Sequence, residues 1–131
     1  MEIVGKTVLV LGAWGMVGMA ICRELLLEEK PALLVLSSLT QEEVQEAEAI
    51  LRAEFPQSTT RLFAESGNIF LRGEHKDKSR QDLLEDPQCR QDILEDMLEE
   101  LTPEVLERSF FYRICQRYRP EVVIDCINSA T

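Results

Sequence analysis

The stretch that decides the fold is KTVLVLGAWGMVG, residues 6–18. Residues 6–11 are a compact run rich in valine and leucine, which is typical of a strand buried on both faces of a sheet. Three glycines follow this run, at Gly12, Gly15 and Gly18, and apolar residues then recur at helical spacing. The stretch therefore predicts a β-strand, a tight turn and an α-helix, in that order.

The first helix is predicted over residues 16–29, and a proline ends it. Its apolar face is expected to consist of Val17, Ala20, Ile21 and Leu25. Residues 32–36 predict a second strand, and Thr40 is the predicted N-cap of a second helix. The apolar face of that helix is expected to consist of Val44, Ala47, Leu51 and Phe55. Residues 59–64 predict a third, shorter strand.

Residues 65–81 predict a polar loop, and residues 82–100 predict helix with Pro87 as a break or a first-turn residue. The apolar face of this segment is expected to consist of Ile93, Leu94, Met97, Leu98 and Leu101. Thr102 and the proline after it predict the start of another helix that runs to about Arg117.

A wide buried stripe is expected on this last helix, formed by Leu106, Phe110, Phe111, Ile114, Cys115 and Tyr118. Residues 121–127 predict a fourth strand. Because strands and helices alternate, the fold class is expected to be α/β, with a parallel sheet and right-handed crossovers.

The glycine spacing between a strand and a helix suits a bound pyrophosphate. Gly12 permits the sharp turn, Gly15 lets the backbone approach the phosphates, and Gly18 lets the helix pack closely against the strand. The N-terminus of the helix then presents free N–H groups and the positive end of its dipole to the anion. We therefore expect NAD or NADP to bind at residues 12–18; the alternative is a tight turn without a ligand.

The net charge of −10 is concentrated in one segment. Residues 82–107 contain ten carboxylates and one base, Arg90, and so contribute −9. An acidic surface repels phosphate backbones, so we expect no nucleic-acid partner. The acidic segment is expected to form a solvated helix face; a docking surface for a basic partner is the alternative.

No apolar run approaches the roughly 20 residues that cross a bilayer, and no signal peptide is visible. We therefore expect no membrane partner and a cytoplasmic location. The four cysteines show no metal-ligand spacing, and His75 has no ligand-spaced neighbour, so no metal site is predicted. Three of the cysteines, Cys22, Cys115 and Cys126, are expected to be small buried hydrophobes.

Three stretches together resemble the extended short-chain dehydrogenase/reductase superfamily, the NAD(P)-dependent epimerase/dehydratase family. They are the GxxGxxG turn at residues 12–18, the Gly-Asn-Ile triplet at residues 67–69, and VVIDCINSAT at residues 122–131. The resemblance implies a Rossmann-like, doubly wound sheet of four strands in the order 3-2-1-4, with an acidic helical insert at about 72–107 before the fourth strand. Residues 1–131 would then be a partial NAD(P)-binding domain without the substrate-binding part.

The resemblance also implies the cofactor contacts. In the turn these are Gly12, Ala13, Trp14, Gly15, Met16, Val17 and Gly18; elsewhere they are Ser37, Ser38, Asn68, Ile69, Ile127 and Asn128. Asn68 replaces the family's usual Asp beside the adenine, and Ile127 and Asn128 would border the ribose and nicotinamide. The choice between NAD and NADP stays open, because Ser37 and Ser38 stand where NAD-specific proteins carry an acidic residue.

The family's catalytic Tyr-xxx-Lys does not occur in this chain. By resemblance the parent is an NAD(P)-dependent oxidoreductase, and we expect the 131-residue chain alone to be inactive. A non-catalytic NAD(P)-sensing module and an interaction protein that acts through its acidic helices are the alternatives.

The fourth strand is expected to leave an apolar edge at residues 122–127. Such an edge offers unpaired backbone groups to a second chain, so we expect self-association through it, or else aggregation. The alternative is a monomer in which the acidic insert covers that edge.

Overall fold

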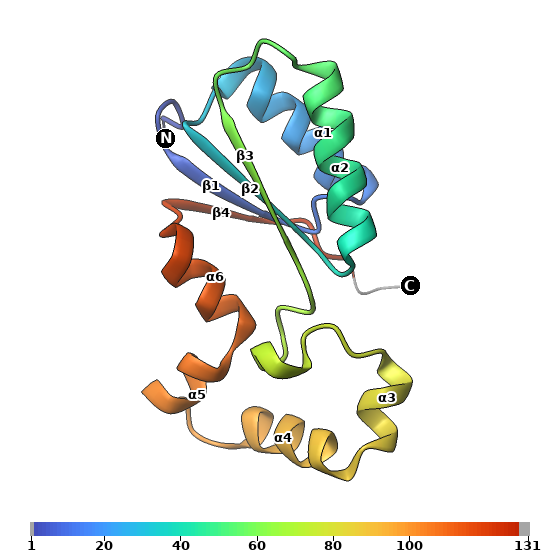
Figure 1. Ribbon diagram of the computed structural model, residues 1–131. Coiled ribbons are helices and arrows are strands. Elements are labelled where there is room, and N and C mark those ends of the chain that lie inside the picture. The colour runs from blue at the N-terminus through green and yellow to red at the C-terminus, as the bar shows by residue number, and fades with distance from the viewer. Residues whose placement is uncertain (1, 129–131) are drawn as a thin grey trace. The chain divides into compact units, whose positions relative to one another are not determined.

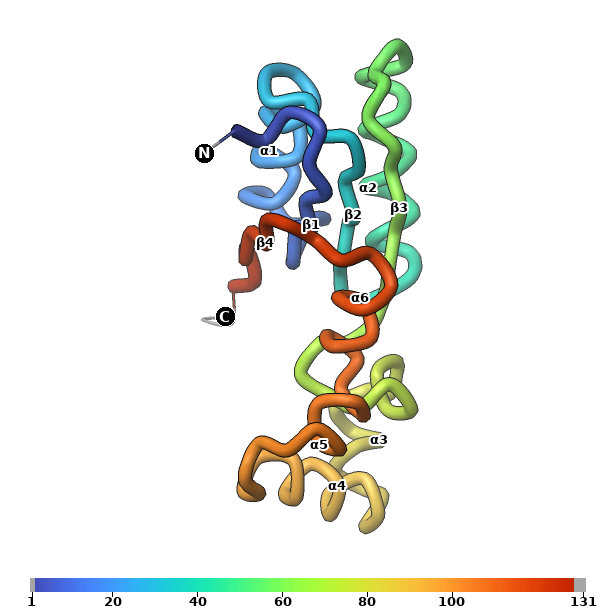
Figure 2. Tube along the Cα trace, turned by 90° about the vertical axis from the view of Figure 1, so that its left-hand side faces the viewer, coloured from blue at the N-terminus to red at the C-terminus, as the bar shows by residue number. Residues whose placement is uncertain are grey.

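The computed structural model describes residues 2–128, which divide into two compact units. The sheet unit contains the chain up to Gly67 and again from Tyr118 onward, and the helical unit is Asn68–Arg117. Figures 1 and 2 show each unit from two directions. The insert expected at about 72–107 lies within the helical unit. None of the helices among the described residues combines the length and the apolar character that a bilayer crossing requires.

The sheet unit is built on four parallel strands. They are β1 (Thr7–Leu11), β2 (Leu33–Ser38), β3 (Arg61–Ser66) and β4 (Val122–Asp125). Their spatial order is β3-β2-β1-β4, and Val8 of β1 pairs with Leu34 on one side and Val122 on the other. The apolar residues of β1 and β2 are buried because both strands lie inside the sheet. The expected α/β Rossmann-like fold and strand order are confirmed.

Two helices of the sheet unit lie side by side along one face of the sheet (Figure 1). Helix α1 (Met16–Glu24) continues as a π-helical segment, Leu25–Glu29, and α2 is Gln41–Glu54. Thr40 caps α2 as expected, because its side chain accepts a hydrogen bond from the Glu43 N–H at 3.2 Å. The core lies between these helices and the sheet; its fully buried members include Val8, Val10, Cys22, Leu34, Leu36 and Leu51.

The buried face of α1 differs from the expected one. Val17 and Ala20 are exposed, and the buried face consists of Gly18, Met19, Cys22, Leu25 and Leu26. The cause is the close approach of Gly18 to the glycine turn, where a Cβ on Gly18 would lie 2.0 Å from the Gly12 oxygen. That approach fixes the rotation of the helix about its axis. The predicted face is therefore right for Leu25, which is buried, and for Ile21, which packs half-buried against the core, and wrong for Val17 and Ala20.

The helical unit contains a short 3-10 helix, Gly73–His75, and three helices, followed by α6, which crosses its boundary. The helices are α3 (Arg80–Glu85), α4 (Pro87–Leu98), α5 (Pro103–Arg108) and α6 (Phe110–Tyr118). The predicted loop over 65–81 is therefore partly wrong, because β3 covers its start and α3 its end. The prediction for Pro87 is confirmed: it is the first residue of α4, and Asp86 caps that helix by accepting from the Gln88 N–H at 2.9 Å.

The single helix expected from Thr102 to Arg117 is broken at Ser109. Its backbone is extended and forms a bridge with Arg72, and the Phe110 N–H donates to the Leu71 oxygen at 3.0 Å. Ser109 also caps α6, because its hydroxyl accepts from the Tyr112 N–H. Serine is a preferred N-cap residue, so Ser109 is the residue in the sequence that fits the start of a second helix at this point.

The expected apolar faces of these helices are only partly buried. On α4 the exposed residues are Leu94, Met97, Leu98 and, beyond its end, Leu101, whereas Cys89 and Asp92 are buried. On the stripe expected for α5 and α6, Phe110 and Ile114 are buried, Phe111, Cys115 and Tyr118 are half-buried, and Leu106 is exposed. The helical unit therefore buries the polar residues His75 and Asp92 as well as apolar ones such as Phe110 and Ile114.

Candidate functional site

The glycine turn lies at the carboxyl end of β1, between the ends of β2 and β4. The Ala13 N–H donates to the Ser37 oxygen at 3.0 Å, and the Cys126 N–H donates to the Leu11 oxygen at 2.9 Å. Ala13 and Ser37 are both buried, so they serve the turn through the backbone. The structure thus brings together at one edge of the sheet the residues predicted around the turn.

Two of the three glycines are required by the fold itself. Gly12 has a φ of +72°, and a Cβ there would lie 2.9 Å from the backbone of Cys126. A Cβ on Gly18 would lie 2.0 Å from the Gly12 oxygen and 2.8 Å from Ala13 Cα. Backbone atoms cannot yield at such distances without moving the strand or the helix.

Gly15 is different, because nothing in the protein requires a glycine there. Its φ is −64°, which suits any residue, and an added Cβ would meet only the Gly12 oxygen at 3.6 Å, an ordinary contact. The space above Gly15 is therefore open from the protein side. A glycine at such a position leaves room for something other than the chain itself.

The first turn of α1 has the geometry of an anion-binding site. Gly15 is the N-cap and provides no side-chain hydrogen bond, and no acidic residue lies in the first turn. The N–H groups at the start of a helix have no partner within it, and the positive end of the helix dipole lies at the same place. Met16 is 91% and Val17 61% exposed, so this end of the helix is open to a ligand.

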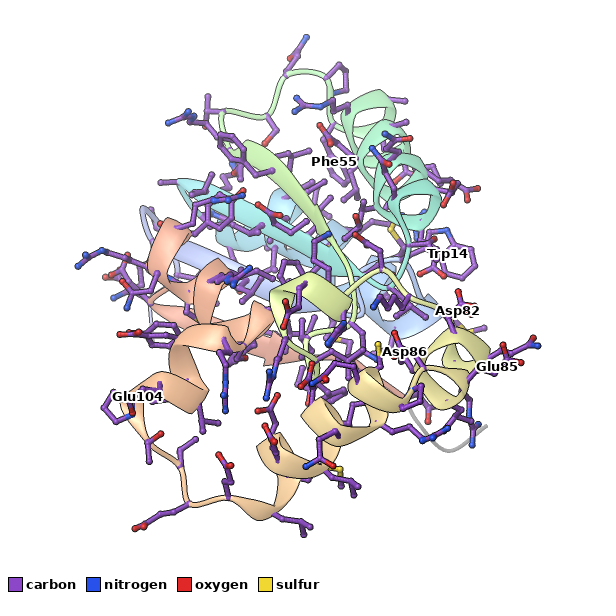
Figure 3. All side chains as sticks on the ribbon, turned by 60° about the horizontal axis from the view of Figure 1, so that its bottom comes forward. Trp14, Phe55, Asp82, Glu85, Asp86 and Glu104 are labelled. Carbon is purple, nitrogen blue, oxygen red and sulfur yellow. The ribbon has the colours of Figure 1, made fainter. Side chains whose placement is uncertain are left out.

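Trp14 lies in the turn and is anchored by α2. Its indole Nε1–H donates to Glu46 Oε2 at 3.0 Å, and both side chains are exposed. Trp14 is labelled in Figure 3. The contact joins the turn to the neighbouring helix across the end of β2. Trp14 is the only tryptophan in the chain, which makes it a local optical reporter of the turn.

Glu43 lies at the end of β2, beside the two serines; the sequence places Glu42 and Glu43 shortly after them but does not say which carboxylate reaches the strand end. The Ser38 hydroxyl donates to Glu43 Oε2 at 2.5 Å. Glu43 comes from the first turn of α2, five residues beyond Ser38, and so supplies the carboxylate that seemed to be missing from the end of the strand. The cap at Thr40 is the sequence signal that places Glu43 there.

The end of β4 lies against the turn on its other side. A Cβ on Gly12 would lie 3.0 Å from the Ile127 nitrogen, and the Ile127 N–H itself donates to Asp125 Oδ1 at 2.9 Å. Ile127 and Asn128 are exposed. Residues 129–131, the end of the small-residue stretch, lie outside the described residues.

Asn68 and Ile69 belong to the helical unit. The Asn68 N–H donates to the Lys76 oxygen at 2.8 Å, and Asn68 Oδ1 accepts from the Phe70 N–H at 2.9 Å. The amide oxygen thus closes a local turn and keeps a second lone pair for another donor. Ile69 is buried, so little of its side chain is open to a ligand; the adenine contacts of this pair stay predictions.

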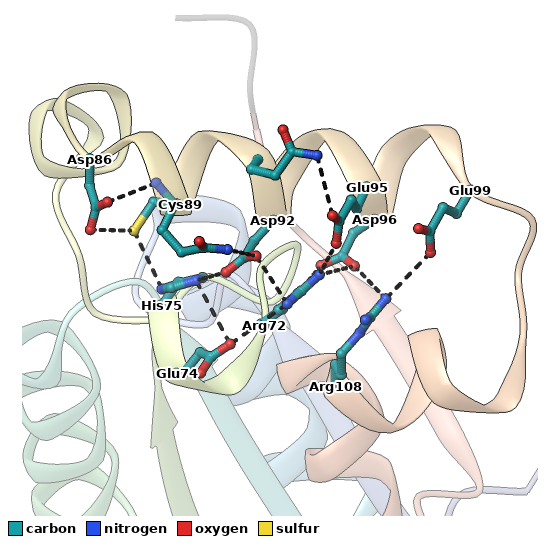
Figure 4. A network of polar contacts seen from close by, with 12 residues as sticks. Arg72, Glu74, His75, Asp86, Cys89, Asp92, Glu95, Asp96, Glu99 and Arg108 are labelled. Carbon is teal, nitrogen blue, oxygen red and sulfur yellow. Dashed lines mark hydrogen bonds and ion pairs between the residues drawn. The ribbon is translucent and has the colours of Figure 1, made fainter.

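The acidic segment is more than a solvated face, because part of it surrounds Arg72. Arg72 Nε lies 2.8 Å from Asp96 Oδ2, and its Nη atoms lie 3.2 Å from Glu95 Oε2 and 3.3 Å from Asp92 Oδ1 (Figure 4). Arg108 also contacts Asp96, at 3.0 Å. These contacts raise the pKa of Arg72, most of all through the hydrogen bond to Asp96. The expectation of a solvated face is wrong for Asp92, which is buried, but it holds for the seven of the ten carboxylates that are exposed.

His75 has close neighbours that its sequence context did not reveal. Its Nε2 lies 2.7 Å from Asp92 Oδ2, and ligand-type atoms of Glu74, His75 and Asp92 lie within 4.8 Å of one another. Arg72 Nη1 approaches both carboxylates, at 3.8 Å from Glu74 Oε1 and 3.3 Å from Asp92 Oδ1. Since Arg72 already supplies a positive charge to both carboxylates, we assign the three residues to a polar network around Arg72.

Comparison with known proteins adds little to this geometry. No protein-family model matches the chain, and no curated protein matches it. Among solved structures, the X-ray structure of Pen from Bacillus thuringiensis is 26% identical over 53% of this chain and 20% of that chain, with a TM-score of 0.41. A likeness of that size supports no argument about function.

Proposed function

We propose that the chain binds a nicotinamide dinucleotide, with the pyrophosphate against the turn from Gly12 to Gly18. The observation that carries the proposal is Gly15, a glycine that neither the backbone angles nor the packing requires. It lies directly at the uncapped N-terminus of α1, where phosphate oxygens find N–H donors and a favourable dipole. A ligand whose phosphates approach the backbone explains why this position has no Cβ.

The place of the turn in the sheet supports the same proposal. In open α/β sheets, ligands bind beyond the carboxyl ends of the strands, where the strand order reverses. With the order β3-β2-β1-β4, that point lies between β1 and β4. The glycine turn follows β1 there, and the residues after β4 border it.

Within this proposal, the cofactor is NAD rather than NADP. A carboxylate at the end of the second strand accepts hydrogen bonds from the adenosine ribose hydroxyls, and its charge repels a 2′-phosphate. Glu43, held by Ser38 at 2.5 Å, places such a carboxylate at the end of β2. No lysine or arginine occurs between Lys30 and Arg52 to offset it.

The chain would serve as the cofactor-binding portion of an NAD-dependent epimerase, dehydratase or reductase. When bound, the nicotinamide supplies hydride transfer. This chain's residues would hold the pyrophosphate and the adenosine ribose, while Ile127 and Asn128 would border the nicotinamide side. We also propose a cytoplasmic setting, since the four cysteines are free and suit a reducing compartment.

Substitutions at Gly15 test the binding site directly. Gly15→Ala should weaken NAD binding, and Gly15→Asp should abolish it, because each adds bulk where the phosphates lie and the second adds a like charge. Ala20→Asp is the matched control, since it adds the same charge to an exposed position of the same helix. Calorimetry gives the affinities, and quenching of Trp14 fluorescence reports binding at the turn. Unchanged affinity in a folded Gly15→Asp chain would refute the site.

The choice of cofactor is tested at Glu43. The native chain should bind NADP about tenfold or more weakly than NAD, because the carboxylate faces the phosphate. Glu43→Gln should narrow that difference, whereas Glu42→Gln, an exposed neighbour in the same helical turn, should not. If the native chain binds NADP as tightly as NAD, Glu43 does not lie at the ribose, even if the Gly15 site is correct.

A further inference from the structure

A second group of reactive side chains lies within the helical unit, in a part of the chain that the proposed function does not use. His75 ends the 3-10 helix, and Cys89 and Asp92 lie on α4 three residues apart, so both face the imidazole. His75 Nε2 lies 2.7 Å from Asp92 Oδ2, and His75 Nδ1 lies 3.6 Å from Cys89 Sγ (Figure 4). Cys89 is completely buried, and the other two side chains are nearly so.

Asp92, His75 and Cys89 form a chain of contacts in which His75 lies between the carboxylate and the thiol. In this arrangement the imidazole can accept the proton of the cysteine. The pKa of Asp92 is lowered, first by the hydrogen bond with His75, so its carboxylate only accepts. An accepting carboxylate needs a donor, so Nε2 carries the proton of that bond; in the neutral imidazole, Nδ1 then has the lone pair, and Nδ1 is the ring nitrogen that faces Cys89 Sγ. An imidazole oriented in this way by a carboxylate is the arrangement that activates a thiol nucleophile.

A lysine stabilises the charge that deprotonation would create. Lys78 Nζ lies 3.0 Å from Cys89 Sγ, and this hydrogen bond is the largest cause of the raised pKa of Lys78. One group opposes it: Asp86 Oδ2 lies 3.4 Å from the same sulfur and accepts from the neutral thiol. The sulfur thus faces two groups that favour the thiolate, His75 and Lys78, and one that disfavours it.

Cys89 Sγ is fully buried, and a hollow of about 390 Å³ lies on the other side of the residues that cover it. The residues that line the hollow are Lys78, Asp82, Glu85 and Asp86, and two of them, Lys78 and Asp86, contact Cys89 Sγ. Figure 3 labels the three carboxylates. Lys78 is exposed, so a reagent in the hollow would reach the sulfur when the Lys78 side chain moves aside. The carboxylates favour a small uncharged reagent over an anion.

We propose that Cys89 is an activated thiol that hydrogen peroxide oxidises to a sulfenic acid. His75 Nδ1 takes the thiol proton, and the thiolate attacks one peroxide oxygen, so that an S–O bond forms as the O–O bond breaks. The departing hydroxide takes the proton back from His75 and leaves as water. The sulfur is oxidised by two electrons, and the peroxide is reduced by two.

The protein contains its own control for burial. Cys22 is also fully buried, but its surroundings are apolar, and burial raises its pKa to about 12. The full chain is treated with hydrogen peroxide, quenched with catalase, unfolded and alkylated with iodoacetamide, and the free thiol left at each cysteine is measured by peptide mass spectrometry. Cys89 should lose its thiol roughly tenfold faster than Cys22, because only Cys89 has a partner that takes its proton. Equal rates would overturn the proposal.

Two substitutions with opposite expected effects separate activation from mere structural support. Lys78→Met keeps the length of an exposed side chain but removes its charge and should slow oxidation of Cys89, whereas Lys78→Arg should restore it. Asp86→Asn keeps a good helix cap but removes the opposing charge and should speed oxidation. A loosened fold would speed the reaction in both Lys78→Met and Asp86→Asn. If Lys78→Met oxidises as fast as the native chain or faster, the assigned role of Lys78 is wrong.

Discussion

At the scale of single residues, Gly15 and Gly18 stand three positions apart in one turn and meet opposite surroundings. Gly18 lies against backbone atoms of the turn, and Gly15 lies against open space. One glycine therefore serves the fold, and the other serves a ligand under the proposed function. The two roles can be separated by the same substitution made at each position.

We predict that Gly18→Ala destabilises the chain by about 1–3 kcal/mol or more, because its Cβ would force α1 away from the turn. Gly15→Ala should change the free energy of unfolding by only about 0.5 kcal/mol, as is usual for an open position. Urea unfolding followed by circular dichroism measures both changes. Equal losses at the two positions would show that Gly15 is also held by packing.

At the scale of elements, the 3-10 helix and α4 are joined by buried polar contacts where other helices use apolar ones. Asp92 is the centre of these contacts, since it accepts from His75 and Gln88 and lies beside Arg72. Three apolar residues of α4, Leu94, Met97 and Leu98, are exposed. The stability of the packing between α4 and the 3-10 helix should therefore depend strongly on pH, whereas replacing an exposed leucine of α4 should change it little.

The pH dependence follows from the lowered pKa of Asp92. A carboxyl group whose pKa is lower in the folded chain than its ordinary value of 3.8 stabilises the fold above that value. That contribution is lost as the pH falls through the lowered pKa. We predict that the helical unit unfolds in acid below about pH 4, and that this transition is weaker in Asp92→Asn. At neutral pH, the same substitution should lower the free energy of unfolding by about 2 kcal/mol. Acid titration by circular dichroism of both chains gives the comparison; Glu100→Gln, at an exposed position, is the control.

The elements also show how far the sequence predicts this structure. The strands were predicted from dense runs of Val, Leu and Ile. Such runs indicate strands reliably here because a parallel sheet buries both of its faces. The predicted face of α1 was wrong at Val17 and Ala20 because the tight contact of Gly18, and not the apolar spacing, sets the rotation of the helix. The requirement that Gly18 pack closely was already implied by the motif, so this error was avoidable.

The partners of His75 were not predictable in the same way. Cys89 and Asp92 lie 14 and 17 residues from it, and no spacing rule joins a short 3-10 helix to a following α-helix. At the candidate site, the turn was found because its three glycines lie within seven residues of one another in the sequence. The contact of Glu43 with Ser38 was not predicted, because it depends on the path of the loop between β2 and α2.

At the scale of the whole molecule, β4 lies at the edge of the sheet within the described residues. Its outer side offers backbone groups to another strand, and Val123 is 44% exposed. We predict self-association that grows with salt, since salt screens the net charge of −10. Val123→Lys should reduce it, because a charge on an edge strand opposes pairing. Light scattering over a concentration series provides the measurement; a monomer at high micromolar concentration and moderate salt would contradict the prediction.

The pairing of the sheet also implies an order of assembly. β1 meets β2 and β2 meets β3 after short excursions of the chain, but Val8 meets Val122 only when almost the whole chain has returned. The loop from Val8 to Val122 is about two doublings longer than the loop from Val8 to Leu34, which raises the entropic cost of closing it by about 1 kcal/mol. The β1–β4 edge, where the ends of both strands meet the glycine turn, is therefore expected to form last. If residues 68–117 fold first, the effective loop between β1 and β4 becomes shorter. The folding rate of the helical unit would then determine when β1 pairs with β4.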